Sequence, residues 1–143
     1  MVLHNLSNGT KNIIMSKNRK FNSTIKSKKL AVIGLGYVGL PLAIEFGKKR
    51  GVIGFDISQK RIDQLKNGDD INREVSKKEF KKSTNLIITN EIKKIKNCNI
   101  FIVTIPTPID QNNKPDLTLL KKCCNMIGSF IKKNDLIIFE STV

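Results

Sequence analysis

The chain has 143 residues, which fits one domain, and it contains no Trp. Lys and Arg outnumber Asp and Glu by 26 to 12, and seven of these basic residues lie in the first 30 positions, which contain no acid. No apolar run approaches the ~18 residues that cross a bilayer, and no aromatic residues alternate with the basic ones, so we expect no membrane and no nucleic acid as partner.

Residues 1–29 are basic and rich in Ser, Thr and Asn. They lack the apolar core of a secretory signal, so we expect a disordered leader ahead of a domain over residues 30–143. A transit peptide and a start at Met15 are the alternatives. His4, the only histidine, lies in this leader and is a poor candidate for catalysis.

The first half of the domain alternates short apolar runs with helical patterns. Gly51 follows a basic helical end, Ser58 and Ser76 can cap two helices, and Gly68 can end the first of them. Glu79 completes a capping box with Ser76. In chain order we expect a strand over Leu30–Ile33, a helix over Val38–Lys49 with Val38, Leu42, Ala43 and Phe46 on its apolar face, a strand over Val52–Phe55, a helix over 58–66 and a short helix after Ser76.

The second half continues the alternation, and Asp116 can cap its long helix. The expected elements are a strand over Leu86–Thr89, a short helix over Glu91–Lys96, a strand over Ile100–Thr104, a loop over Ile105–Pro115, a helix over Leu117–Ile131 and a strand over Leu136–Glu140. This pattern predicts an α/β fold, a Rossmann-type doubly wound parallel sheet in the order 3-2-1-4-5, truncated after the fifth strand. That strand would leave an exposed apolar edge.

The first strand runs into a Gly-x-Gly-x-x-Gly turn that opens a helix, the context in which this pattern predicts a dinucleotide site. Gly34 would permit the tight turn, Gly36 would let a pyrophosphate approach the backbone, and Gly39 would let the helix pack closely on the sheet. The phosphates would meet the N–H groups near Tyr37 and Val38 at the positive helix end. We therefore predict a phosphate cradle here.

Asp56 ends the second strand, 22 residues after Gly34, where a ribose-binding acid belongs. Its carboxylate would accept hydrogen bonds from the adenosine ribose and repel a 2′-phosphate, which favours NAD over NADP. Lys60 and Arg61 leave room for the opposite preference, because a nearby cation can accommodate that phosphate. We predict NAD because Asp56 would be the nearest charge.

Cys98, Cys123 and Cys124 form no Cys-x-x-Cys pair and have no His nearby, so we predict no metal site. We interpret all three as packing residues. An odd cysteine count without a secretory signal fits a reducing cytosol, so we expect a cytoplasmic protein.

Together these pieces resemble the UDP-glucose/GDP-mannose dehydrogenase family, over about residues 29–143. The resemblance rests on the glycine turn, on Gly54-Phe55-Asp56 with Arg61, and on segments of the second half: Val103-Thr104-Ile105-Pro106-Thr107-Pro108, Pro115-Asp116-Leu117 and Glu140-Ser141-Thr142-Val143. Within the family, the sequence is most similar to the branch that oxidises UDP-N-acetylhexosamines.

The resemblance implies an NAD-dependent oxidoreductase that converts the C6 alcohol of a UDP-sugar to the carboxylate with two NAD⁺, in polysaccharide precursor synthesis. It also implies a homo-oligomer at full length. Thr142 would lie near the nicotinamide and a catalytic water. The cofactor-binding residues implied are Gly34, Leu35, Gly36, Tyr37, Val38, Gly39, Asp56, Arg61, Val103, Thr104, Ile105, Pro106, Thr107 and Thr142.

The chain departs from the family in one decisive respect. The family's cysteine nucleophile belongs to a glycine-rich motif that none of the three cysteines matches, so we expect no turnover from this polypeptide alone. A β-hydroxyacid or 6-phosphogluconate dehydrogenase domain, or a non-catalytic NAD-sensing module, is the alternative interpretation.

Overall fold

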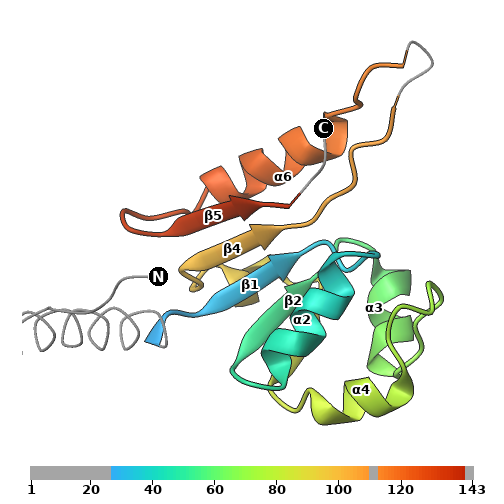
Figure 1. Ribbon diagram of the computed structural model, residues 1–143. Coiled ribbons are helices and arrows are strands. Elements are labelled where there is room, and N and C mark those ends of the chain that lie inside the picture. The colour runs from blue at the N-terminus through green and yellow to red at the C-terminus, as the bar shows by residue number, and fades with distance from the viewer. Residues whose placement is uncertain (1–26, 110–112, 141–143) are drawn as a thin grey trace, which may run out of the picture.

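The computed structural model describes residues 27–109 and 113–140. Its strands form one parallel sheet in the order β3-β2-β1-β4-β5, which confirms the predicted α/β architecture (Figure 1). The strands are β1 (Leu30–Ile33), β2 (Val52–Phe55), β3 (Leu86–Thr89), β4 (Ile100–Val103) and β5 (Leu136–Phe139). The helices are α2 (Gly39–Gly47), α3 (Gln59–Lys66), α4 (Lys77–Lys82), α5 (Ile92–Ile95) and α6 (Thr118–Gly128).

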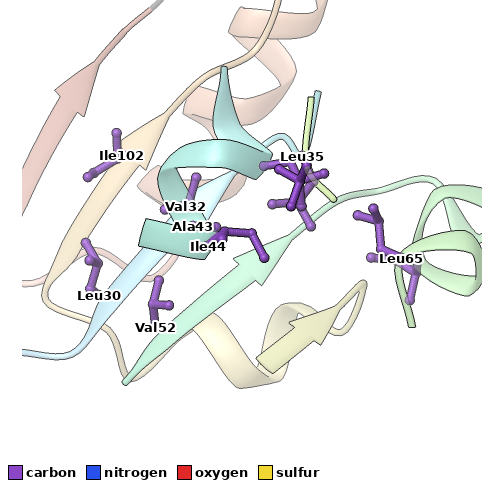
Figure 2. Close-up of a cluster of buried hydrophobic side chains, with 11 residues drawn as sticks. Leu30, Val32, Leu35, Ala43, Ile44, Val52, Leu65 and Ile102 are labelled. Carbon is purple, nitrogen blue, oxygen red and sulfur yellow. The ribbon is translucent and has the colours of Figure 1, made fainter. Parts of the chain in front are cut away.

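Alternating strand residues build the two faces of the core, because successive side chains of a strand point to opposite sides. Leu30 and Val32 of β1 belong to a buried cluster with α2 and α3, which Figure 2 shows. Ala31 and Ile33 belong to a second cluster with α5 and α6. The sheet is therefore covered on both faces, as its apolar strands require.

The helix caps follow the sequence closely. Ser58 Oγ accepts a hydrogen bond from the backbone N–H of Arg61 (3.3 Å), and Ser76 forms the predicted capping box with Glu79. Gly68 has a φ of 71°, so its backbone takes the left-handed turn that ends α3. These local rules fix where the connections to the sheet begin and end.

Our expectation for the first helix was wrong at Val38 and at the helix end, whereas Ala43 is buried and Leu42 and Phe46 pack against the core as predicted. Val38 is 54% exposed, and the buried residues of α2 are Gly39, Leu40, Ala43, Ile44 and Gly47. The buried face begins at Gly39, whose backbone lies against Gly34 and Thr104 at the end of the sheet. The helix stops at Gly47, where its last carbonyls bond to the N–H groups of a tightened turn rather than continuing to Lys49.

The last helix is also shorter than predicted. It ends at Gly128, because the N–H groups of Phe130 and Ile131 both donate to the carbonyl of Ile127 and close the chain into a turn. Leu117 rather than Asp116 is the N-cap residue, although Asp116 Oδ1 accepts a hydrogen bond from the Thr118 N–H (2.9 Å).

Candidate cofactor site

The glycine turn lies at the carboxyl end of β1, next to β2 on one side and β4 on the other. This is the point where the strand order reverses, and open α/β sheets bind ligands there. Gly34 has a φ of 94°, and a Cβ on it would lie 3.1 Å from the Thr104 carbonyl oxygen. Its N–H donates to the Phe55 carbonyl (2.8 Å). The turn is thus tied to β2 and pressed against the end of β4.

Gly39 makes the closest approach in the turn. A Cβ built there would lie 1.8 Å from the Gly34 carbonyl oxygen and 2.3 Å from Thr104 Oγ1. Thr104 is a buried residue, 7% exposed, and its hydroxyl lies 2.7 Å from the Gly34 carbonyl oxygen and 3.1 Å from that of Ile33. The third glycine therefore serves close packing, as its place in the pattern predicted.

Gly36 differs from both of these glycines. Nothing lies within 4 Å of a Cβ built on it, and the next two residues, Tyr37 and Val38, are 67% and 54% exposed. In the first turn of α2 the N–H groups of Leu40 and Leu42 donate to the carbonyls of Gly36 (3.2 Å) and Val38 (3.3 Å), and Pro41 has no N–H. The N–H groups of Tyr37 and Val38 come before these, at the positive helix end that favours an anion. Gly36 has open space in front of it where Gly34 and Gly39 do not.

Asp56 joins the glycine turn to the loop after β2. Its Oδ2 accepts a hydrogen bond from the Leu35 N–H and its Oδ1 one from the Ser58 N–H, both at 2.9 Å. A carboxylate has about four acceptor positions, so each oxygen retains capacity for a ligand donor. The half-buried carboxylate thus lies beside the turn, as the spacing predicted.

An apolar cleft of about 400 Å³ opens beside Gly34 and Asp56. It lies between the ends of β1 and β2 on one side and the loop after β4 with α6 on the other. Its lining consists of Ile33, Gly34, Phe55, Asp56, Ile57, Ile92, Ile105, Pro106, Leu119, Lys122, Cys123 and Met126. Such a slot, mostly aliphatic with one carboxylate at its rim, is suited to a flat heterocycle attached to a polyhydroxylated sugar.

Eight of these lining residues were not among the predicted site residues: Ile33, Phe55, Ile57, Ile92, Leu119, Lys122, Cys123 and Met126. Ile57 is the one that the sequence could have indicated, because it is an apolar residue directly after the predicted ribose-binding acid Asp56. In the structure it is 86% exposed, as a residue that contacts a ligand can be. Those from α5 and α6 give no such indication, because only the folded sheet brings their helices to this edge.

The other predicted site residues lie in different surroundings. Ile105 and Pro106 line the cleft, while Val103 is fully buried and Thr104 faces the glycine turn. Arg61 points its Nε at the Leu35 carbonyl (2.9 Å) and its Nη2 at Asp70 (2.7 Å). The role of Thr107 stays a prediction, and so does that of Thr142, which lies outside the described residues.

Two of the three cysteines are packed as expected. Cys98 and Cys123 are buried, and burial raises the pKa of each thiol to about 11. Cys124 is exposed, so the interpretation of it as a packing residue was wrong: it falls on the outer side of α6, one position beyond Cys123.

Within residues 27–109 and 113–140, no cluster of three or more His, Cys, Asp or Glu side chains is placed to hold a metal ion. The same residues contain no helix that is long and apolar enough to cross a membrane.

Residues 28–143 match the NAD-binding domain of the UDP-glucose/GDP-mannose dehydrogenase family. The chain belongs to this family. It is 51% identical over 119 residues to the UDP-N-acetyl-D-glucosamine 6-dehydrogenase of Salmonella typhi and 54% identical over 119 residues to that of Pseudomonas aeruginosa. In both cases the match covers 83% of this chain and 28% of the relative.

Solved structures agree with this family membership. The UDP-D-ManNAc dehydrogenase of Pyrococcus horikoshii matches with a TM-score of 0.73 and 31% identity, over 80% of this chain and 28% of that one. The chain thus spans about 28% of the length of the family members it matches, and the part it spans is their NAD-binding domain.

Proposed function

We propose that this chain is the NAD-binding part of a UDP-N-acetylhexosamine 6-dehydrogenase. Bound NAD⁺ would accept hydride as the full-length enzyme oxidises the sugar C6 alcohol to the carboxylate. The observation that carries the proposal is Gly36, which has open space in front of it at the start of α2 while its two partner glycines are tightly packed.

The phosphate end of the site follows from that space. A pyrophosphate would lie over Gly36 and accept hydrogen bonds from the backbone N–H groups of Tyr37 and Val38, aided by the positive end of α2. Gly34 and Gly39 would shape the turn without touching the phosphates, because their Cβ positions face the protein. Thr104 would act in the same indirect way, through its contact with the Gly34 carbonyl.

The adenosine end would occupy the apolar cleft. Adenine would lie between Ile57 and the residues Ile105 and Pro106, while the remaining acceptor positions of Asp56 would take the ribose hydroxyls. The carboxylate at that position would repel a 2′-phosphate at close range. NAD would therefore bind more tightly than NADP.

We propose that the cysteine nucleophile of the full-length enzyme is none of the three cysteines of this chain. Cys98 and Cys123 are buried with raised pKa values, and Cys124 lies on the outer face of α6. A buried thiol of this pKa stays protonated at neutral pH and is a poor nucleophile. Binding and orienting NAD would be the contribution of these residues, with a UDP-sugar as substrate of the whole, homo-oligomeric enzyme.

Gly36→Val tests the proposed site by calorimetry. We expect NAD affinity to fall by about a hundredfold or more, because the added side chain occupies the phosphate position without a clash against the protein. Gly51→Val is the matched control: Gly51 also has open space around its Cβ but lies at the opposite end of the sheet, ahead of β2. Equal NAD affinity in the two variants would refute the assigned site.

A further inference from the structure

Asp70 is a buried carboxylate that lies outside the cleft, in the turn between α3 and α4. Its side chain is only 1% exposed. Oδ2 accepts hydrogen bonds from the N–H groups of Glu74 (2.8 Å) and Val75 (3.1 Å), and Oδ1 from the Asn72 N–H (3.2 Å). Burial raises the pKa of Asp70, but the Arg61 guanidinium and these N–H groups outweigh it and hold the pKa below its ordinary value. The Asp70 carboxylate is thus surrounded by donors from Arg61 and from the backbone of its own turn.

Arg61 connects Asp70 to the glycine turn. Nη2 donates to Asp70 Oδ1 (2.7 Å) while Nε donates to the carbonyl of Leu35 (2.9 Å). Nη1 is buried and has no hydrogen-bond partner among the described residues. Nε and Nη2 are therefore engaged by protein acceptors, and Arg61 is not among the residues that line the cleft. The contact between Arg61 and adenosine that the family resemblance implied stays a prediction.

The peptide groups of Leu35 are held on both sides. The carbonyl accepts from Arg61, the N–H donates to Asp56 Oδ2 (2.9 Å), and the side chain is fully buried. Leu35 stands between Gly34 and Gly36, and glycine can adopt more backbone conformations than any other residue. The orientation of the Gly36 backbone thus depends on contacts made at Leu35.

We propose that Asp70 is a positioning residue for the NAD pyrophosphate, acting through Arg61 and the Leu35 carbonyl. The inference rests on the proposed NAD site and adds a residue 14 positions beyond Asp56 that touches no part of the ligand. Fixing the turn before binding lowers the conformational entropy that the ligand must overcome. The planar guanidinium suits this role because it donates from two separate nitrogens, Nε and Nη2, whereas a lysine ammonium donates from a single nitrogen.

Asp70→Asn tests the inference, with NAD affinity measured by calorimetry below the unfolding temperature. We expect a loss of about tenfold, the size of one charge-assisted hydrogen bond. Asp69→Asn is the matched control, because Asp69 is the neighbouring acid but pairs with Lys77 on the surface, where the two side chains are 59% and 73% exposed. That variant should bind NAD as the wild type does.

Two further measurements separate positioning from damage to the fold. Adenosine, which lacks the pyrophosphate, should bind Asp70→Asn as well as it binds the wild type, followed by NMR titration. Arg61→Lys should lose NAD affinity to the same degree as Asp70→Asn, and the double variant should lose little more, since the residues act as one unit. If Asp70→Asn does not fold, Arg61→Lys carries the test.

Affinity for NAD within twofold of the wild type in both variants would overturn the role of Asp70 and leave the proposed function intact. Equal losses for NAD and adenosine would also overturn it, since they would indicate general damage. Absence of NAD binding by the wild-type protein would instead refute the proposed function itself.

Discussion

The glycine-turn side of the sheet and its β5 side are held together differently. On the first side, β1 and β2 lead into turns that are locked by polar contacts, with Asp56, Arg61 and Thr104 each bonded to backbone groups of the turn. On the second side, α6 packs against β4 and β5 through apolar contacts such as those of Phe101 and Ile127. The difference matches the two demands of a dinucleotide, precise N–H positions for phosphates and an apolar wall for a base.

The edges of the sheet continue the comparison. Ser83 Oγ donates to the Ile44 carbonyl (3.1 Å) and thereby fastens α2 to the segment before β3. β5 pairs only with β4 among the described strands, and Leu136 and Phe139 are each 51% exposed. β3 is an edge strand too, with Ile87 53% exposed, so the two edges differ in how the adjoining segment is fastened. We call the β3 side the closed side, because Ser83 fastens it to α2, and the β5 side the open side, because it presents Leu136 and Phe139.

The largest expected effect is that of Gly39→Ala. A methyl group there would overlap the Gly34 carbonyl and the Thr104 hydroxyl, so the turn must open or the helix must shift. We expect the free energy of unfolding to fall by about 3 kcal/mol or more, measured by urea denaturation. Gly36→Ala is the control, and it should change the free energy of unfolding by less than about 1 kcal/mol. Similar losses in the two variants would show that the closed turn is not what stabilises this side.

The contrast between these glycines shows what the sequence could predict. The pattern of three glycines after a strand predicted a turn, a helix and their separate duties, because each duty follows from backbone geometry. It did not predict that α2 would bury Leu40 and Ile44 rather than Val38. The helical period shows which residues share a face, but it does not show which face the sheet covers. In α2 the close contact at Gly39 decides this, because it holds the start of the helix against the end of the sheet.

The same limit applies to the site. Asp56 was predictable because its distance from the turn along the chain is fixed by one β-α-β unit. The role of Asp70 was not predictable, because its contacts to Arg61 and three backbone N–H groups form only when the α3–α4 turn is folded. The residues of α6 that line the cleft were missed for the same reason.

The next effect concerns the open side. We expect the 143-residue chain to self-associate through β5, since an unpaired apolar edge strand invites another strand. Phe139→Lys should shift sedimentation profiles toward the monomer and change the free energy of unfolding by about 1 kcal/mol or less, because the side chain is half exposed.

Ile71→Lys serves as the control for this experiment. Ile71 is 70% exposed but lies in the α3–α4 turn on the closed side. It should leave self-association unchanged. A monomeric wild type at the same concentration, or an equal shift in both variants, would contradict a special role for the β5 edge.

The smallest expected effect is the response of the closed side to acid. The pKa of Asp70 is lower in the folded protein than in the unfolded chain, so the unfolded chain binds a proton first as the pH falls. The stability contributed by Asp70 is therefore complete above the unfolded pKa of about 4 and is lost as the pH falls through the folded pKa. Between about pH 5 and about pH 3, the wild type should lose more unfolding free energy than Asp70→Asn, measured by urea denaturation at each pH. Asp69→Asn should follow the wild type, because Asp69 pairs with Lys77 at the surface. Parallel pH curves for the wild type and Asp70→Asn would mean that the Asp70 charge does not hold the turn, and that the closed side is held by its other polar contacts, such as those of Asp56 and Thr104.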